Sequence, residues 1–511
     1  MSGESMAKYY ITTPIYYVND HPHLGHMYTT VAADVLARYQ RLQGDDVFFL
    51  TGVDEHGQKV QEAAEKKGLK PIELADAVVE RYQQLWPKLS ISHTDFIRTS
   101  EDRHKQVVQT LWKQLEQKGA IYKGVYEDWY CVPCETYWTQ TQLEENDCCP
   151  DCHRAVQKVK EESYFFRLSD YQQPLLDYIN ENLDFIAPVS RRNEVISFIE
   201  SGLRDLSISR TTFSWGVPVP GDEKHVIYVW IDALSNYLSA LGYPDADNMD
   251  FWPASVHLVG KDILRFHAIY WPCILMAAGL PLPKRVFAHG WWTVDGKKMS
   301  KSLGNALQPD DLLKNWEGDV LRYFLLREVP FGSDGDFSES ALKMRYNSEL
   351  ANDIGNLLNR SLSMLQKYKG GILGKVTSHE LDVELCQHMD KMPVSVQQAM
   401  QGQAFHQALE AINSLVRHGN RYVEQSAPWK LAKEDHIERL DTVLYHLIDL
   451  LRLTAFYLSP FMPNKAEAMM AQIMNTHVEL QTFNLAEHGH RGNLTAGHEC
   501  GKPHPLFPRM I

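Results

Sequence analysis

The order of apolar runs at the start of the chain constrains its fold more than any other feature. An apolar run at residues 9–15 leads into a turn-forming segment at 19–22, Asn-Asp-His-Pro. Apolar side chains then recur every three or four residues, as along one face of a helix; they are Tyr28, Val31, Val35, Tyr39 and Leu42. Gly44 is a plausible helix stop before a second apolar run at 47–50. This βαβ start predicts a parallel sheet that binds ligands at the carboxyl ends of its strands.

The rest of the chain divides by its pattern. Polar segments and five of the eight cysteines interrupt the alternation after residue 117, and the alternation resumes near 227. Segments with helical period dominate the last third, which is typical of a helical bundle. We therefore expect an α/β protein. Its parts are a Rossmann-like sheet domain in two halves, 1–117 and 227–291, an insertion at 118–226, a connecting region at 292–350, a helical domain at 351–484 and a tail at 485–511.

Charge and hydropathy exclude several classes of protein. The net charge of −14 argues against a general polyanion binder, although a local basic face is compatible with it. The longest near-apolar run, 270–283, contains three prolines. It falls short of the ~18–20 apolar residues that a bilayer span needs. The first six residues do not resemble a secretory signal. We expect a cytoplasmic protein with no membrane partner.

A His-Leu-Gly-His motif, from His23 to His26, stands where the first strand gives way to the helix. Gly25 allows the backbone to approach a phosphate closely, and a helix start offers free N–H groups and the positive end of the helix dipole. His23 and His26 can donate hydrogen bonds to phosphate oxygens as charge builds there. Two alternatives are polar residues that merely begin a helix, and a metal cluster that also includes His21.

A second motif, Lys-Met-Ser-Lys-Ser, occupies residues 298–302 in a segment flanked by glycines. Lys298 and Lys301 provide two point charges suited to the β- and γ-phosphates of a nucleotide. Ser300 and Ser302 add hydroxyl donors. A solvated basic turn is the alternative interpretation. The presence of both motifs favours activation of a substrate by a nucleoside triphosphate.

Two CxxC pairs, Cys131 with Cys134 and Cys149 with Cys152, lie 14 residues apart within the expected insertion. Four thiolates in this spacing are typical of one structural, tetrahedral Zn²⁺. Cys148 is an extra thiol, and we prefer Cys149 because it restores the CxxC spacing. Two disulfides are less compatible with the expected compartment. A thioredoxin-like redox role is a further alternative.

The two phosphate motifs resemble the HIGH and KMSKS signatures of class I aminoacyl-tRNA synthetases. Longer segments are similar to the methionyl-tRNA synthetases over almost the full length; they are residues 10–19, 52–57, 229–237, 259–267, 288–294 and 298–302. The resemblance implies that methionine and ATP, with Mg²⁺, form methionyl-adenylate. The methionyl group then passes to the 3′-terminal adenosine of initiator and elongator methionine tRNA. It also implies a zinc knuckle in the insertion and anticodon binding by the helical domain. No C-terminal dimerisation domain is recognised, so we expect a monomer.

The same resemblance assigns individual residues. Arg210 joins the two histidines and two lysines near the reacting groups, and Asp54 faces the substrate ammonium group. ATP-binding positions are Gly25, Gly260, Asp262, His289, Ser300 and Ser302. Methionine-binding positions are Ile15, Tyr17, Asp54, Trp230, Ala233, Leu234, Tyr237, Ile263, His267 and Trp271. An aromatic lining suits a polarizable thioether. The alternative is that these aromatic residues, at helical spacing, belong to the core.

The implied anticodon residues are Asn356, Arg360 and Trp429. Unstacked bases stack on aromatic rings and form hydrogen bonds through their edges. Taken alone, however, Arg360 is also compatible with a solvated helix charge, and Trp429 with a helix-start aromatic.

Two rival functions remain. The first is a sister class I synthetase for isoleucine, valine, leucine or cysteine. The branched-chain enzymes generally carry a large editing domain, which an insertion at 118–226 is too short to hold. A cysteine enzyme would use zinc in its active site. The second rival is a nonenzymatic, zinc-containing RNA-binding protein built on a decayed synthetase. The intact histidines and lysines of both motifs argue against it.

Overall fold

The main sheet is parallel, as the βαβ start predicts. The structure, a computed structural model, describes residues 6–18, 21–294, 296–298 and 307–510. Within them, seven strands follow the order β2-β3-β1-β13-β14-β8, with β4 beside β3. All neighbouring pairs are parallel. The strands are β1 Lys8–Thr12, β2 Tyr16–Tyr17, β3 Asp46–Asp54, β4 Asp95–Arg98, β8 Ile186–Ala187, β13 Val256–Gly260 and β14 Val286–His289.

Side chains of the central strands alternate between two hydrophobic cores, one on each face of the sheet. Tyr10 and Leu50 belong to one core, and Ile11 and Phe49 belong to the other. The alternation arises because successive side chains of a strand point to opposite faces. Burial on both faces explains why these strands read as apolar runs in the sequence.

Helices cover both faces of this sheet. Helix α1 runs from Leu24 to Gln43 between β1 and β3, and it ends at Gly44, as predicted. The φ of Gly44 is 92°, a left-handed conformation that glycine adopts at little cost. The other helices up to residue 278 are α2 Gln58–Glu65, α3 Pro71–Lys88, α4 Asp102–Gln117, α5 Gln172–Glu181, α6 Val189–Glu200, α7 Val229–Leu234, α8 Asn236–Ser239 and α9 Trp271–Ala278.

The insertion forms its own antiparallel sheet, in the order β6-β5-β7-β9. Its strands are β5 Ile121–Cys131, β6 Thr136–Trp138, β7 Gln157–Phe166 and β9 Leu206–Ser207. A smaller sheet follows, with β10 Ser209–Arg210, β11 Pro218–Val219 and β12 Asp222–Ile227. The range expected as an insertion also holds β8, which pairs with β14 at the edge of the main sheet. The chain therefore returns to the sheet domain within residues 118–226.

Short 3-10 and π-helical segments interrupt the regular helices along the chain. From Lys261 to Ala278, a 3-10 turn, a π turn and α9 succeed one another. The short segments are η1 Gln140–Gln142, η2 Leu168–Tyr171, η3 Asp247–Phe251, η4 Lys261–Ile263, η5 Phe266–Tyr270, η7 Tyr346–Gly355 and η8 Leu480–Thr482; η5 and η7 are π-helical. A third small sheet holds β15 Trp292–Val294, β16 Lys297–Lys298 and β17 Gly335–Phe337.

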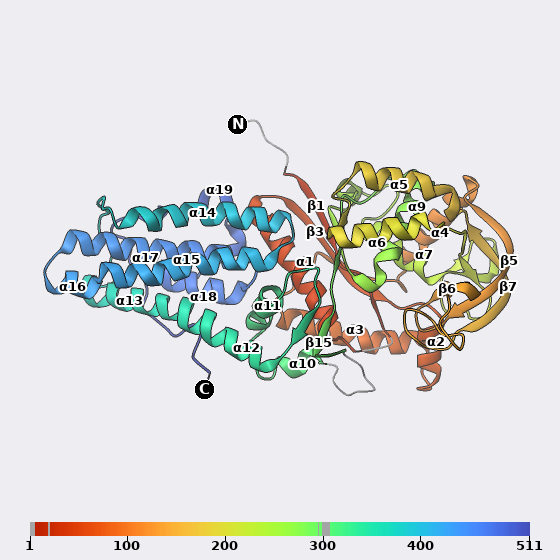
Figure 1. The fold of residues 1–511 in the computed structure, drawn as a ribbon, viewed down its shortest axis with the longest axis horizontal. Helices are drawn as coiled ribbons and strands as arrows, with labels where there is room; N and C mark the ends of the chain where they lie inside the picture. Colours follow the sequence, from red (N-terminus) through yellow and green to blue (C-terminus); the bar gives the residue numbers. More distant parts are fainter. Residues whose placement is uncertain (1–5, 19–20, 295, 299–306, 511) are drawn as a thin grey trace.

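The last third is helical, as its periodicity predicts. Its helices are α10 Pro309–Leu312, α11 Gly318–Arg327, α12 Glu339–Arg345, α13 Asn356–Lys369, α14 Asp382–Gln401, α15 Phe405–Ser426, α16 Pro428–Lys433, α17 Ile437–Leu458, α18 Pro463–Met474 and α19 Leu485–His488. Figure 1 shows this bundle at one end of an elongated molecule, the insertion strands β5 and β7 at the other, and β1, β3 and α1 between them. No helix within the described residues combines the length and apolar character that a membrane crossing requires.

Candidate active site

The start of α1 is shaped by its two histidines. His23 is the N-cap, and its Nδ1 accepts a hydrogen bond from the Gly25 N–H at 3.1 Å. In return, Nδ1 of His26 accepts from the His23 N–H at 3.3 Å. The two imidazole rings stack with their centroids 3.6 Å apart. A Cβ on residue 25 would lie 3.0 Å from Cε1 of His23, so any larger residue here would push on the His23 ring.

These hydrogen bonds determine where each imidazole carries its proton. An Nδ1 that accepts from an N–H holds no proton, so Nε2 is the donor in both His23 and His26. The Tyr82 hydroxyl lies 3.0 Å from Nδ1 of His26 and supports the same tautomer. Burial, and then the charge of His23, lowers the pKa of His26 well below its ordinary value. Both rings can therefore donate Nε2–H to an anion at the N-terminus of α1.

The carboxyl ends of β13 and β14 lie beside this helix start. Gly260 and His289 are register partners at the ends of these strands. Nε2 of His289 lies 2.6 Å from the hydroxyl of Thr29, in the second turn of α1. A Cβ on residue 260 would lie 2.5 Å from Oδ1 of Asp262, which accepts a hydrogen bond from Nε1 of Trp291 at 3.2 Å. The structure thus brings together the expected ATP-binding positions Gly25, Gly260, Asp262 and His289 along one edge of the sheet.

The lysine motif falls mostly outside the described residues. Ser300, Lys301 and Ser302 lie there entirely. Of Lys298, only the backbone is described, in β16, where it pairs with Thr293 of β15. Their roles remain predictions from the sequence.

Tyr237 and His267 form a buried, uncharged pair. Nδ1 of His267 lies 3.0 Å from the carbonyl of Ile263 and donates to it, which leaves Nε2 as the acceptor. The Tyr237 hydroxyl donates to this Nε2 at 2.7 Å. Burial lowers the pKa of His267 to about 4, so the ring is neutral at physiological pH. The pair offers polar atoms without a charge, which suits a neutral ligand group.

The other expected methionine-binding residues surround this pair or line its approach. Trp271 packs 6.1 Å from Tyr237 between ring centroids, and Trp230 stacks on Phe266 at 3.6 Å. Trp230, Ala233 and Leu234 come from α7, Ile263 from η4, and Ile15 and Tyr17 from the segment around β2. Some buried polar atoms here have no hydrogen-bond partner within the described residues; they are Tyr17 Oη, Trp230 Nε1, His257 Nε2 and Trp271 Nε1. Such atoms mark places where a ligand or water completes the structure.

Asp54 ends β3 and is buried beside other acidic groups. Its register partner is Tyr17, on the neighbouring strand β2. Burial, and then the negative charge of Asp232, raises its pKa well above the ordinary value. A cation placed next to Asp54 would relieve this unfavourable state. The expected role toward a substrate ammonium group is therefore electrostatically sound.

A buried His-Asp-His network fixes the loop that follows Asp54. Asp232 of α7 lies 2.6 Å from Nδ1 of His56 and 2.6 Å from Nε2 of His104. Burial by itself raises the pKa of Asp232. The charge of His56 and the hydrogen bond from His104 outweigh burial and lower this pKa to about 2. His56 and Asp232 stand inside the matching segments 52–57 and 229–237, whereas His104 lies far from any motif. The network between them could not be predicted, because it depends on contacts between residues distant in the sequence.

Arg210 lies on the insertion side of the site. It belongs to β10, is buried, and donates to the Ser207 hydroxyl at 3.2 Å. Its guanidinium lies 5.0 Å from the ring of Tyr130 and 5.2 Å from that of Tyr228. Glu161 Oε1 is 3.7 Å away. The arginine is thus preoriented between two aromatic faces.

Four cysteines converge in the insertion. The Sγ atoms of Cys131, Cys134, Cys149 and Cys152 all lie within 4.8 Å of one another. Cys131 and Cys152 are 3.5 Å apart, and Cys134 and Cys149 are 4.0 Å apart. Sulfurs around a tetrahedral Zn²⁺ with ~2.3 Å bonds are separated by about 3.8 Å, so the donor set fits. The structure thus assembles the predicted CxxC pairs into one cluster that could hold a metal ion. Cys148 is not part of it, and its thiol faces the Asn146 carbonyl at 3.7 Å.

Two further residues enter the site without an obvious sequence signal. His257 of β13 accepts or donates at 2.6 Å to the Thr12 hydroxyl, and its ring lies 4.2 Å from Tyr237. Glu135 directly follows Cys134, is buried, and reaches the neighbourhood of Tyr17. His257 lies outside every motif and matching segment of the sequence. The adjacency of Glu135 to a cysteine pair was the only available signal.

The expected anticodon residues lie on the helical bundle. Asn356 and Arg360 are one turn apart at the start of α13, and Asn356 is exposed. Arg360 pairs with Glu424 of α15 at 2.8 Å. Trp429, in α16, keeps 37% of its surface exposed, which is unusual for a tryptophan. These side chains are accessible, and Arg360 is held by an ion pair at rest.

Comparison with known proteins relates this geometry to a family. The family model for class I tRNA synthetases (M) matches residues 9–161 and 153–362, and that for the anticodon binding domain of methionyl tRNA ligase matches residues 374–511. A methionine–tRNA ligase of Caldanaerobacter subterraneus is 52% identical, with 98% of this chain and 79% of the relative covered. One from Rickettsia felis is 48% identical, with 98% of both covered.

Solved structures agree. The Mycobacterium tuberculosis methionyl-tRNA synthetase in complex with methionyl-adenylate has a TM-score of 0.95 at 42% identity, with 99% of this chain and 100% of that chain covered. Its apo form has a TM-score of 0.89 at 39% identity, and both chains are fully covered. Sequence, fold and site geometry lead to one conclusion: the chain belongs to the methionyl-tRNA synthetase family of class I tRNA synthetases.

Proposed function

We propose that the chain charges methionine tRNA in two steps. Methionine and ATP form methionyl-adenylate and pyrophosphate, and the methionyl group then passes to the 3′-terminal adenosine of the tRNA. The observation that carries the proposal is the pairing of two unlike sites on one sheet. The Tyr237–His267 pair lies beside β13, where the Tyr237 ring contacts His257. The histidine donors of α1 come after β1, the strand that pairs with β13.

Methionine is placed with its two ends in different environments. The thioether lies against the Tyr237–His267 pair and the rings of Trp230 and Trp271, because a polarizable, uncharged sulfur favours aromatic contact. The ammonium group lies against Asp54, whose carboxylate it stabilises. Ile15, Tyr17, Ala233, Leu234 and Ile263 complete the site. A branched-chain amino acid lacks the sulfur, so it cannot make the same contact with the aromatic rings.

ATP is placed along the helix start and the ends of β13 and β14. The Nε2–H groups of His23 and His26 donate to phosphate oxygens, and Gly25 admits the phosphate to the N-terminus of α1. Gly260, Asp262 and His289 hold the nucleoside side. Lys298 and Lys301, with Ser300 and Ser302, act on the β- and γ-phosphates. When bound with ATP, Mg²⁺ supplies charge neutralisation of these phosphates.

The reaction needs positioning more than covalent help from the protein. The carboxylate of methionine attacks the α-phosphorus, the bond to the bridging oxygen breaks, and pyrophosphate leaves. Arg210 and the histidine donors stabilise the charge that develops on the reacting groups. The insertion has a structural role. Zn²⁺ held by the four cysteines would fix the fold of this segment, because four protein thiolates leave no open coordination position.

The helical domain supplies tRNA recognition in this proposal. Asn356 and Arg360 bind base edges and Trp429 stacks on a base of the anticodon. Initiator and elongator methionine tRNA share this anticodon loop contact, so both are substrates.

The decisive experiment is amino-acid-dependent exchange of pyrophosphate into ATP by the purified chain. We expect exchange with methionine and little with valine or cysteine, followed by charging of methionine tRNA when tRNA is added. Preferential exchange with valine or cysteine would assign a sister specificity. An absence of exchange with every amino acid would overturn the proposal and favour a binding protein.

A further inference from the structure

Three metal-ligating side chains meet on the helical bundle, far along the chain from the active-site residues. Glu384 and His388 are one turn apart on α14, and His418 lies on the adjacent α15. One ligand atom of each lies within 4.8 Å of the other two. Oε1 of Glu384 and Nε2 of His388 are already 3.9 Å apart. Ligands bonded at ~2.0–2.1 Å to a tetrahedral Zn²⁺ are about 3.3 Å apart, so small side-chain rotations would close the set.

His418 is oriented as a metal-ligating histidine usually is. Nδ1 of His418 donates to the carbonyl of Ser414 at 2.7 Å, which leaves the lone pair of Nε2 available. The rings of His388 and His418 approach to 3.4 Å between centroids. Burial, and then the charge of His418, lowers the pKa of His388, while the charge of Glu384 acts in the opposite direction.

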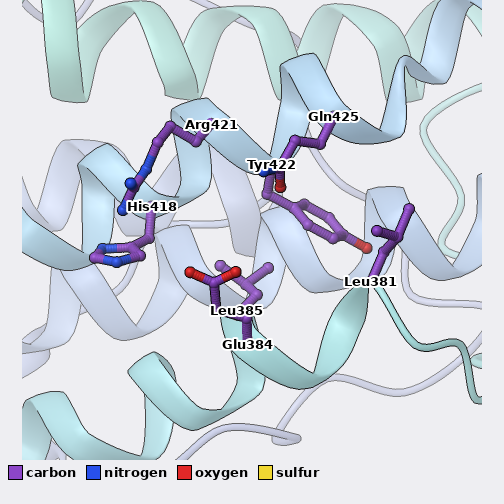
Figure 2. Close-up of a pocket in the computed structure, with 7 residues that line it drawn as sticks. All are labelled: Leu381, Glu384, Leu385, His418, Arg421, Tyr422 and Gln425. Carbon is purple, nitrogen blue, oxygen red and sulfur yellow. The ribbon is translucent and has the colours of Figure 1, made fainter.

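A small cavity adjoins two of these ligands. Figure 2 shows the Glu384 carboxylate and the His418 ring facing each other between α14 and α15. The cavity has a volume of about 30 Å³, and its other lining residues are Leu381, Leu385, Arg421, Tyr422 and Gln425. That space holds roughly one water, which can serve as a further ligand. Arg421 opposes a cation by charge, so the site favours an ion with strong bonds to imidazole.

We propose that Glu384, His388 and His418 bind one divalent transition-metal ion, Zn²⁺ or Ni²⁺, and thereby crosslink α14 to α15. Two imidazoles and one carboxylate suit these ions, whereas Mg²⁺ and Ca²⁺ require mainly oxygen ligands. The ion would bind the folded bundle and not the unfolded chain, so it would stabilise the bundle by mass action.

The test titrates the full chain, with its cysteine cluster already loaded with zinc, with Ni²⁺ alone. We expect one additional equivalent and a rise in Tm, with no response to Mg²⁺. The exposed Glu384→Gln variant should weaken Ni²⁺ binding by about 10-fold or more. The double variant His388→Ala/His418→Ala should abolish it. His477→Ala, an exposed histidine outside the cluster, is the matched control.

Two results would overturn this site. One is a wild-type chain that takes up no equivalent beyond the cysteine-bound zinc. The other is an additional equivalent that persists unchanged in both Glu384→Gln and the double variant. Glu384→Gln keeps the test informative if the double variant does not fold, because Glu384 is exposed.

A second, independent observation concerns Glu135, which directly follows Cys134. It is only 2% exposed and has a φ of 53°, a left-handed conformation that is costly for a residue with a side chain. Its carboxylate accepts a hydrogen bond from the Tyr130 hydroxyl, and its carbonyl accepts one from the Tyr228 hydroxyl. The other carboxylate oxygen, Oε1, has no hydrogen-bond partner among the described residues.

The turn around Glu135 packs against the loop that follows Asp54. Oε1 of Glu135 and Oη of Tyr17 lie 3.5 and 3.4 Å from the position that a Cβ on Gly57 would take. Next to this contact, Nζ of Lys59 in α2 donates a hydrogen bond to the carbonyl of Pro133 in the cysteine turn at 3.4 Å. The cysteine turn therefore touches the expected methionine site from the side of Tyr17.

We infer that Glu135 is a positioning residue, which holds Tyr17 and the Gly57 loop against Asp54. The inference rests on the proposed function. Glu135→Ala should raise the KM for methionine by about 10-fold or more while the KM for ATP and the bound zinc stay unchanged. Glu135→Gln keeps an acceptor for Tyr130 and should restore the KM to within about 3-fold. Glu145→Gln, an exposed neighbour, is the control.

The outcomes separate this role from a merely structural one. An unchanged methionine KM in Glu135→Ala would overturn the inference, as would an equal rise in both KM values accompanied by loss of zinc. Failure of the proposed function is distinguishable, because the wild-type chain would then show no methionine-dependent exchange at all.

Discussion

The ring of His23 lies across the position that a side chain on Gly25 would occupy. We expect Gly25→Ala to displace this ring, because the new Cβ would lie 3.0 Å from Cε1 and 3.1 Å from Nδ1. The hydrogen bond from the residue-25 N–H to His23 would weaken. Exchange kinetics should show kcat/KM for ATP reduced by about 10- to 100-fold. The free energy of unfolding should not fall by much, since alanine favours a helix over glycine by ~1 kcal/mol.

Methionine binding in the Gly25→Ala variant is the internal control. It should stay close to wild type, because the Tyr237–His267 pair does not contact this helix start. An equal loss of methionine and ATP binding would contradict the assignment of Gly25 to the phosphates.

If Asp54 faces the methionine ammonium group as proposed, we expect methionine binding to depend on pH. Its pKa is raised in the free enzyme by burial and then by Asp232, so below that pKa the carboxyl group carries a proton. An ammonium group beside it favours the carboxylate and lowers the pKa, so binding expels a proton. Affinity for methionine should therefore increase as pH rises toward the free-enzyme pKa. Calorimetry in two buffers with different ionisation enthalpies counts the released proton.

The Asp54→Asn variant supplies the comparison. It should bind methionine weakly and release no proton, because an amide does not titrate. Proton release that persists in this variant would assign the effect to another group.

At the scale of elements, two thiols that are adjacent in the sequence have different positions relative to the cysteine cluster. Cys149 belongs to the four-sulfur cluster, whereas Cys148 faces a carbonyl outside it. We expect Cys149→Ser to lose most of the bound zinc and to lower Tm, and Cys148→Ser to retain one zinc per chain. Elemental analysis with a thermal melt measures both. Equal zinc loss in the two variants would contradict the assignment.

Some secondary-structure elements are predictable from the sequence, and others depend on their neighbours in the fold. Helix α1 and its flanking strands were predictable, because apolar spacing and Gly44 report directly on burial and on the helix end. The two-residue strand β8 was not, because so short a segment has no period and owes its conformation to β14. The π turn η5, which presents His267, is likewise set by packing. Resemblance supplied the residues of the site, while the tautomers of His23 and His267 required the fold.

Across the whole molecule, one buried arginine joins the sheet domain to the helical domain. Arg322 of α11 is fully buried and pairs with Asp34 of α1 at 2.7 Å. It also donates to the carbonyls of Phe461, Pro460 and Leu89. Burial by itself raises the pKa of Asp34. The charges of Arg38 and Arg322 outweigh burial and lower this pKa to about 2. This stabilisation is present above the ordinary carboxyl pKa and is lost as pH falls toward 2.

We expect Arg322→Ala to reduce the free energy of unfolding by roughly 3–5 kcal/mol, because it removes the fully buried one of the two arginine partners of Asp34 and the donor to three carbonyls. Denaturant unfolding at pH 7 measures this change. The double variant Arg322→Met/Asp34→Leu should lose much less, since it removes both charges. A double variant as unstable as the single one would show that the carbonyl contacts matter more than the ion pair.

One hydrophobic core runs through this junction without a break, from Ile11 in β1 to Leu447 in α17 and Phe507 near the C-terminus. The sheet domain and the helical bundle of the elongated molecule in Figure 1 are therefore joined by a shared apolar interior. Under the proposed function, the sheet edge and the surface around Trp429 contact opposite parts of one tRNA. Because one core joins them, we expect a substitution in that core to alter both contacts together.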